Sequence, residues 1–206
     1  MSTCPTVEAV FDLEIELTKV DLSHLDADKQ QKLVALLRKH KAVFNDRPSC
    51  SNVLEASLPT KPGFEFKVQK PYRIPDKVKP QILDQVKHLL AEGRIAPAIS
   101  EFVHPVVAVA KQGGGIRLAI DYRLLNQGLV FDSYPMPRAD DTLREIAPAK
   151  ILSACDCSQS FWSIPIRKED QYKTAFVVDG TQYIWQYLPF GLSTSSQLWQ
   201  KTVDIV

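Results

Sequence analysis

The stretch VVAVAKQGGGIRLAIDYRLLN, residues 106–126, decides how this chain folds. Two apolar segments, residues 105–111 and 116–122, are separated only by Gln112 and three glycines. Apolar segments joined by a short loop that contains glycine are typical of a β-hairpin. The sequence therefore predicts a hairpin with a flexible tip, and the cations Lys111 and Arg117 flank that tip.

Helical periodicity is clearest just upstream of this hairpin. Apolar residues recur at helical spacing over residues 78–90, Asp76 is a candidate N-cap, and Gly93 stands where a C-terminal glycine belongs. An earlier segment, residues 28–44, also has one apolar face and predicts an amphipathic helix. Between the two helices, residues 59–75 are rich in proline and are expected to be extended.

Downstream of the hairpin, the patterns predict a short helix near residues 138–146 and a strand over residues 150–156 that ends at Asp156. Residues 173–178 and 181–187 flank Asp179 and Gly180, a dipeptide typical of a two-residue hairpin turn. A final helix is expected from residue 194 onward. Helices and antiparallel hairpins in this order indicate an α+β fold.

Composition excludes several classes of protein. The chain has 206 residues, of which 45% are hydrophobic and 24% charged, as in a globular domain and unlike a disordered tail. No apolar run approaches the roughly 20 residues of a membrane span, so no membrane partner is expected. Glu8 and Asp12 interrupt any secretory signal near the first residue, which favours an intracellular location. The four cysteines lack the paired spacing of a zinc site.

The charge is unevenly distributed along the chain. Residues 61–126 carry 11 basic and 6 acidic side chains, whereas residues 1–60 and 127–206 each carry 7 basic and 9 acidic ones. A basic centre suits a phosphate-rich partner such as a nucleic acid. The alternative is an ordinary solvated surface, which is the more common role of charged residues.

Four blocks resemble, in the same order, the reverse transcriptase of gypsy-type LTR retrotransposons and, more distantly, retroviral enzymes. They are RIAP (94–97) with HPVV (104–107), IRLAIDYRLLN (116–126), SYPMPR (133–138) with LSACD (152–156), and KTAF (173–176) with LPFGL (188–192). The resemblance covers roughly residues 60–206. It implies a variable connection over residues 1–60, followed over residues 61–206 by polymerase fingers and the front half of a palm. The complete palm of the family resembles a split βαβ, ferredoxin-like sheet.

The resemblance implies an RNA-directed DNA polymerase from a Pol polyprotein, in which two Mg²⁺ ions, or Mn²⁺ in their place, promote nucleotidyl transfer. Hard cations require oxygen ligands. By its position, Asp156 matches the first metal-binding aspartate and is the candidate catalytic residue, with the backbone carbonyl of Cys157 as a second metal contact. Considered alone, Asp156 would be read as an ordinary aspartate at the end of a strand.

The resemblance also assigns nucleotide-binding residues. Lys111 and Arg117 match the cations that close on the triphosphate of a deoxynucleoside triphosphate. The alternative is a solvated hairpin, and it applies more to Lys111, because the match through the three glycines is loose, than to Arg117. Phe161 matches the aromatic ring beneath the incoming sugar; the alternative is a core aromatic. Phe190 and Gly191 match the position where the new base pair and the template pass, or they form a tight turn.

Four basic residues of the central segment are candidates for contacts to the phosphates of an RNA or DNA template with its primer. They are Lys67, Lys70, Arg73 and Arg94. For each one taken singly, solvated surface is the alternative. The sequence does not indicate an oligomeric state. In an active element, the resemblance implies a cytoplasmic, virus-like particle.

The sequence departs from the family pattern in one important respect. Members carry Tyr-x-Asp-Asp downstream of the Leu-Pro-Phe-Gly block, and this sequence contains no such motif. Without those carboxylates we expect the chain alone to be inactive. Two hypotheses therefore stay open: a fragment of a polymerase that is active in its longer form, or a retroelement remnant that binds nucleic acid or a protein without catalysis.

Overall fold

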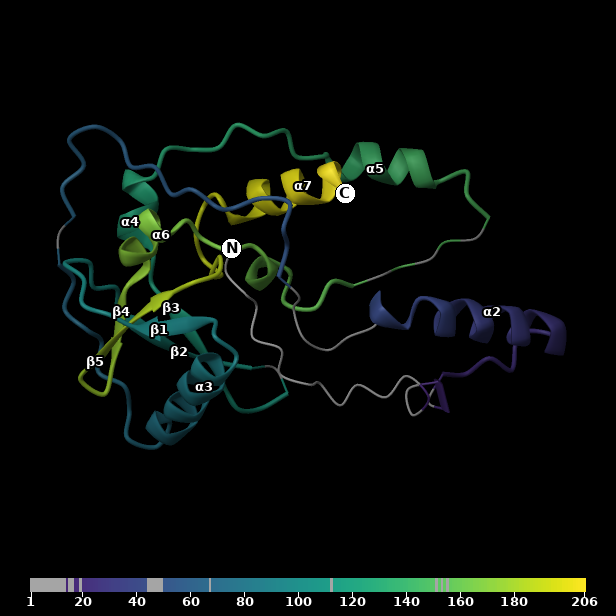
Figure 1. The fold of residues 1–206 in the computed structure, drawn as a ribbon, viewed down its shortest axis with the longest axis horizontal. Coiled ribbons are helices and arrows are strands. Elements are labelled where there is room, and N and C mark those ends of the chain that lie inside the picture. Colours follow the sequence, from purple (N-terminus) through teal and green to yellow (C-terminus); the bar gives the residue numbers. More distant parts are fainter. Residues whose placement is uncertain are drawn as a thin grey trace. The chain divides into compact units, whose positions relative to one another are not determined.

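The computed structural model describes residues 14, 17–18, 20–43, 50–66, 68–111, 113–150, 152, 154 and 156–206. Helices and strands are mixed in an α+β fold, as the sequence predicts (Figure 1). The chain forms two compact units, one of residues 6–48 and the other built from residues 49–206. Among the described residues, every helix is too short or too polar to cross a membrane.

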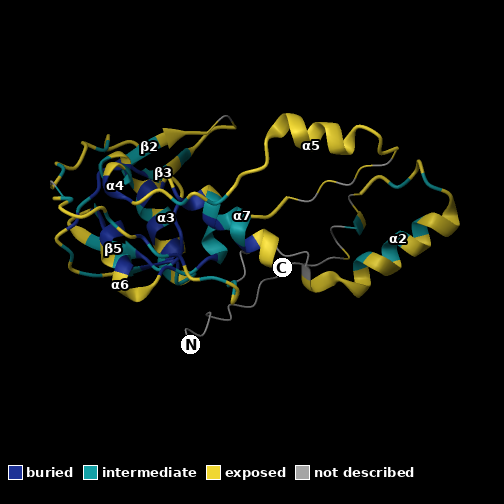
Figure 2. Ribbon diagram, turned by 90° about the horizontal axis from the view of Figure 1, so that it is seen from above, coloured by how far each residue is buried: buried dark blue, intermediate teal, exposed yellow. Residues whose placement is uncertain are grey.

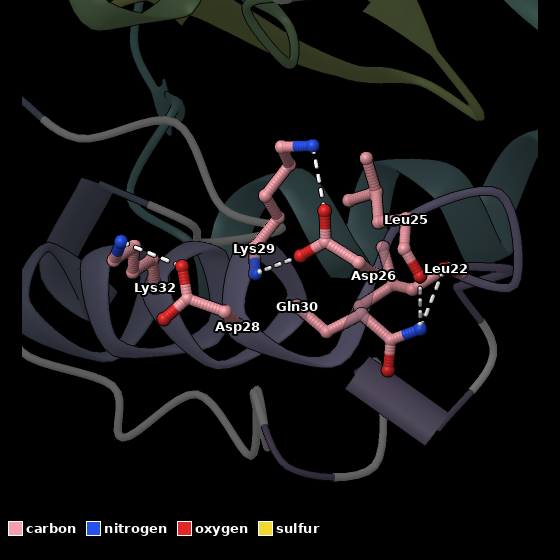
Figure 3. A network of polar contacts seen from close by, with 7 residues as sticks. All are labelled: Leu22, Leu25, Asp26, Asp28, Lys29, Gln30 and Lys32. Atoms are coloured by element: carbon pink, nitrogen blue, oxygen red, sulfur yellow. Dashed lines mark hydrogen bonds and ion pairs between the residues drawn. The ribbon is translucent and has the colours of Figure 1, made fainter.

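The smaller unit contains helix α2 (Ala27–Lys39), which confirms the amphipathic helix predicted there. Asp26 caps it, because its carboxylate accepts a hydrogen bond from the backbone N–H of the third helical residue at 2.9 Å. The Nε2 of Gln30 donates to the carbonyls of Leu22 and Leu25, both at 2.9 Å, so the chain before the helix is held against its first turn (Figure 3). Polar side chains thus set where this helix begins.

The predicted central hairpin is confirmed. Strands β2 (Val106–Ala110) and β3 (Ile116–Ile120) pair antiparallel. At the tip, Lys111 N–H donates to the carbonyl of Gly115 at 3.1 Å. Gly114 and Gly115 have φ values of +88° and +81°, which residues with a side chain rarely adopt. The glycines are therefore needed to turn the chain here.

Helix α3 (Lys79–Ala91) packs against this hairpin through its apolar face. Gly93 follows its end at φ +64°, as predicted. The prediction that Asp76 caps the helix is wrong. The N-cap is Val78, and the N–H groups of Val78 and Lys79 donate to the carbonyl of Pro75 at 3.0 and 3.2 Å. A backbone carbonyl thus takes the place that the Asp76 side chain would have filled.

A second sheet has the order β1-β5-β4 and is antiparallel throughout. It consists of β1 (Ile95–Pro97), β4 (Phe176–Val178) and β5 (Thr181–Trp185), and the predicted turn at Asp179 and Gly180 joins the last two strands. The sequence patterns do not reveal β1. This strand is only three residues long and ends in proline, so it forms because β5 lies beside it.

Short helical elements complete the two units: η1 (Lys41–Val43), α4 (Arg123–Gly128), α5 (Ala139–Ile146), η2 (Ser160–Ser163), α6 (Lys168–Gln171), η3 (Tyr172–Thr174) and α7 (Ser195–Ile205). Helices α5 and α7 confirm the helices predicted near residues 138–146 and from residue 194. Figure 2 shows α5 exposed on all sides, whereas α7 has buried positions. Helix α4 was not predicted.

The strand predicted over residues 150–156 is not seen at the positions of that stretch that are described, which are 150, 152, 154 and 156. Leu152 there is 64% exposed. An extended segment becomes a strand through hydrogen bonds to a neighbouring strand. The two sheets among the described residues are built from other segments, so positions 150, 152, 154 and 156 have no partner strand in either sheet.

The core of the larger unit draws on residues upstream of residue 61. Ala56 and Leu58 are fully buried, and isolated β-bridges join Ala56 to Ile166 and Thr60 to Leu129. Residues 56–60 therefore contribute to the same core as the strands. The division into a connection over residues 1–60 and a polymerase region over residues 61–206 stays a prediction, and the compact unit itself begins earlier in the chain.

Candidate nucleotide and nucleic-acid site

The central hairpin presents its two predicted cations on the same face. Val109 pairs with Arg117 across the strands, and the period of two in a strand directs Lys111 to the same side as Val109. Both cations are exposed. The opposite face carries Ala108, Ile116 and Leu118, which pack on the core. The sequence pattern thus yields a hairpin with one buried face and one cationic, solvent-facing tip.

The structure brings two of the predicted aromatic residues together. The ring centroids of Phe161, in η2, and Phe190 are 5.1 Å apart. Phe161 is half-buried, whereas Phe190 is 51% exposed. Trp162 lies edge-on to Phe190 with centroids 6.0 Å apart. Phe190 is thus packed against two aromatic rings and remains about half exposed to solvent.

The turn after Phe190 is held by an asparagine that the sequence reasoning did not single out. Gly191 has φ +95°. The Nδ2 of Asn126 donates to the carbonyl of Gly191 at 2.9 Å, and its Oδ1 accepts from the N–H of Ser193 at 2.9 Å. The only signal for Asn126 in the sequence is its place at the end of the IRLAIDYRLLN block. Its contacts lie more than sixty residues downstream.

A second polar cluster joins the proline-rich segment to the start of α4. The Nε and a terminal nitrogen of Arg123 donate to the two oxygens of Asp121 at 2.9 and 2.6 Å, and Tyr72 donates its hydroxyl to Asp121 at 3.0 Å. The hydrogen bonds from Arg123, opposed by burial and helped by Tyr72, hold the pKa of Asp121 well below its ordinary value. Arg123 itself stays largely exposed.

Among the basic residues predicted to contact phosphates, the structure separates two groups. Lys70 and Arg73 are exposed on either side of Tyr72, whose contact with Asp121 fixes their segment. Arg94 is only 5% exposed; its guanidinium lies 4.5 Å from the ring centroid of Tyr187, and it donates to the carbonyl of Trp162 at 2.8 Å. This burial favours a core role for Arg94, and its assignment as a phosphate contact stays a prediction. Lys67 lies outside the described residues.

Asp156 and Cys157 are both exposed. A pair of divalent ions needs several oxygen ligands around it. Among the residues that the structure describes, no three His, Cys, Asp or Glu side chains lie close enough together to share a metal ion. The described residues therefore do not fit a two-metal site by themselves. The assignment of Asp156 and the Cys157 carbonyl as metal ligands stays a prediction.

Comparison with known proteins shows which family this part of the chain resembles. The model of the family described as "Reverse transcriptase (RNA-dependent DNA polymerase)" matches residues 109–206, from the hairpin to α7. The "Retrovirus-related Pol polyprotein from transposon gypsy" of Drosophila melanogaster is 35% identical over 129 residues, which cover 60% of this chain and 12% of that protein. Residues 109–206 of the chain belong to the reverse transcriptase family. Its resemblance to the gypsy type is confirmed.

Other reverse transcriptase relatives match a larger part of the chain. The enzymatic polyprotein of Cauliflower mosaic virus (strain Strasbourg) is 30% identical over 185 residues, which cover 85% of this chain and 27% of the relative. The crystal structure of a prototype foamy virus protease-reverse transcriptase mutant shares the fold with a TM-score of 0.76 and 28% identity, covering 92% of this chain and 26% of the viral protein. The chain thus spans between 12% and 27% of the length of these proteins. The family depends on divalent metal ions.

Proposed function

We propose that this chain supplies the fingers and the front half of the palm of an RNA-directed DNA polymerase. One observation carries the proposal. Phe161 and Phe190, assigned to the nucleotide from sequence, lie 5.1 Å apart next to the Gly191 turn, inside the region matched by the family model. Because the chain spans about a quarter or less of its curated relatives, the polymerase activity is assigned to a longer protein.

In this proposal, Arg117 and Lys111 contact the triphosphate of an incoming deoxynucleoside triphosphate, because both are exposed on one face of the hairpin tip. Phe161 and Phe190 contact the sugar and the new base pair. Asp156, with the carbonyl of Cys157, supplies part of a Mg²⁺ site. The carboxylates of a Tyr-x-Asp-Asp segment supply the remaining ligands.

A primer annealed to an RNA or DNA template is the proposed macromolecular partner. Foamy viral protease-reverse transcriptase of the same fold has been solved "in complex with RNA/DNA hybrid" and "in complex with ds DNA". In this chain, the excess of basic residues over residues 61–126 and the exposure of Lys70 and Arg73 support a phosphate-rich partner.

Primer extension tests the proposal in a longer protein that includes the Tyr-x-Asp-Asp segment. We expect Mg²⁺-dependent synthesis that Asp156→Asn abolishes, because the amide does not replace a charged metal ligand. Asp140→Asn, on the exposed helix α5, is the matched control and should retain activity. Full activity of the Asp156→Asn protein would refute the assignment of Asp156, and an inactive parent protein would refute the polymerase proposal.

Binding without catalysis is the second candidate function. It is favoured by the absence of a three-ligand metal cluster from the described residues, together with the basic central segment. It predicts salt-dependent binding of a primer-template duplex to the 206-residue chain, without extension. Both functions predict this binding, so extension by the longer protein distinguishes them. Binding that does not change with NaCl concentration would contradict the electrostatic basis of both.

A further inference from the structure

The side-chain amide of Gln85, on α3, is bonded to the backbone of strand β3. Its Nε2 donates to the carbonyl of Ile116 at 2.9 Å, and its Oε1 accepts from the N–H of Leu118 at 2.9 Å. The same Nε2 also lies 3.1 Å from the carbonyl of Gln81, one turn earlier on the helix. Gln85 therefore contacts the backbone on both sides of Arg117.

The hydrogen-bonding pattern of the hairpin explains why these two groups are available. In an antiparallel pair, successive residues alternate between facing the partner strand and facing the outer edge. Because Lys111 N–H bonds to the carbonyl of Gly115, Arg117 opposite Val109 belongs to the inward-facing set. The backbone groups of Ile116 and Leu118 then face outward. Gln85 satisfies one acceptor and one donor there, as the peptide group of another strand would do.

Helix α3, which carries Gln85, is held in place by its buried apolar residues and by an ion pair at its N-terminal end. Ile82, Val86 and Leu89 are buried in the core, and Gln85 lies between them in sequence and is half-buried. At its N-terminal end, the Nζ of Lys79 lies 2.6 Å from a carboxylate oxygen of Asp179 in the turn between β4 and β5. The first turn of α3 thus contacts the second sheet, while the apolar residues of the helix hold it in the core.

We infer that Gln85 is a positioning residue for Arg117. By holding the carbonyl before Arg117 and the N–H after it, Gln85 fixes the direction in which the arginine leaves the strand, toward the exposed face of the hairpin tip. An oriented guanidinium binds a phosphate group with less loss of conformational entropy than a mobile one. This inference rests on the proposed contact between Arg117 and the triphosphate of the nucleotide. The alternative is that Gln85 only protects the edge of β3.

Gln85→Met tests the contact itself in the 206-residue chain, because methionine keeps the length and the helix propensity of glutamine but lacks the amide. Loss of two hydrogen bonds should speed amide hydrogen exchange at Leu118 by roughly tenfold. Gln81→Met is the matched control, since Gln81 is exposed on the same helix and the substitution leaves its backbone carbonyl in place. Unchanged exchange at Leu118 in Gln85→Met would overturn the inference.

Kinetics in the longer protein separate positioning from edge protection. We expect Gln85→Met to raise KM for the deoxynucleoside triphosphate roughly tenfold with little change in kcat, and to add little when Arg117→Met is already present. If Gln85→Met speeds amide hydrogen exchange at Leu118 but leaves the KM for the nucleotide unchanged, Gln85 does not position Arg117. Its role is then only to protect the edge of β3. If the longer protein without substitutions extends no primer, both the polymerase proposal and the positioning role of Gln85 are refuted. The hydrogen-exchange measurement on the 206-residue chain still shows whether Gln85 stabilises the backbone of β3.

Discussion

Asn126 and Gly191 are joined by a hydrogen bond of 2.9 Å from the asparagine Nδ2 to the glycine carbonyl. The same amide accepts a hydrogen bond from Ser193 N–H, so one side chain holds both sides of the turn that follows Phe190. The left-handed conformation of Gly191 and the exposed ring of Phe190 both depend on the shape of this turn. Two residues of separate sequence blocks therefore form one structural unit.

Replacing Asn126 with alanine should lower the free energy of unfolding by about 1 kcal/mol, because both freed backbone groups lie near the surface and can bond to water. Affinity for a primer-template duplex should also fall, since the turn loses its support. Urea denaturation and a filter-binding titration measure the two effects. Gln127→Ala, at the neighbouring exposed position, is the control. Equal affinities for the two variants would show that the turn needs no support from Asn126.

Gly191→Ala tests the close backbone approach assigned to this turn. An added Cβ would meet the Ile120 carbonyl and the Tyr122 ring at 3.6 Å, which is ordinary contact, so the cost of about 1 kcal/mol comes from the φ of +95°. Gly180→Ala is the matched control for Gly191→Ala, because Gly180 also has a positive φ, +76°, and has open space around it. Both variants should lose similar stability in thermal unfolding. Only Gly191→Ala should weaken primer-template binding, and equal binding by both would contradict the assignment.

Breaking the buried pair of Lys173 and Asp170 should strongly destabilise the larger unit. The Nζ of Lys173 contacts the Asp170 carboxylate and donates to the carbonyl of Leu58 at 2.8 Å. Lys173→Met leaves a buried carboxylate without its cation and should cost about 3–5 kcal/mol in urea unfolding. Adding Asp170→Asn should recover part of this loss. Lys32→Met, which breaks an exposed pair with Asp28, should cost at most about 0.5 kcal/mol.

His104 should make stability depend on pH between about 4 and 6.5. Burial lowers its pKa to about 4, although its bond to the Lys173 carbonyl opposes the shift. As the pH falls from 6.5 toward 4, the unfolded chain binds a proton that the folded protein does not, so stability is lost by up to about 3 kcal/mol and then levels off. Unfolding measured across this range should lose that slope in His104→Gln. His88→Gln, at an exposed position, should retain it.

The basic residues should differ in their effect on salt dependence. If Lys70 and Arg73 contact phosphates, Lys70→Gln and Arg73→Gln should each reduce the slope of log affinity against log salt concentration by about 0.9 for a duplex. Lys87→Gln, exposed on α3, serves as the control and should leave the slope unchanged. Arg94→Gln should instead lower the melting temperature with no change in slope, since it removes the guanidinium that packs over the Tyr187 ring and bonds to the Trp162 carbonyl. A reduced slope in Arg94→Gln would support Arg94 as a phosphate contact.

Elements stabilised by local contacts were predictable from sequence. The β2–β3 and β4–β5 hairpins are closed by glycine-containing turns, and α3 has a continuous apolar face. Strand β1 was missed because it depends on β5, nearly ninety residues away. The strand predicted before Asp156 is not seen at its described positions, because no neighbouring strand in the two sheets pairs with them.

The sequence by itself determined the family, because four blocks in order carry information that no single residue does. It also identified Arg117, Phe161, Phe190 and Gly191 as candidates. Only the tertiary structure decided what surrounds each candidate: Phe161 lies against Phe190, Arg94 is buried with its guanidinium over the Tyr187 ring, and Gln85 and Asn126 bind the backbone of residues far along the chain. The physical reason is that burial and hydrogen bonding are set by contacts between distant segments, whereas sequence patterns report mainly on neighbours within one helix or hairpin.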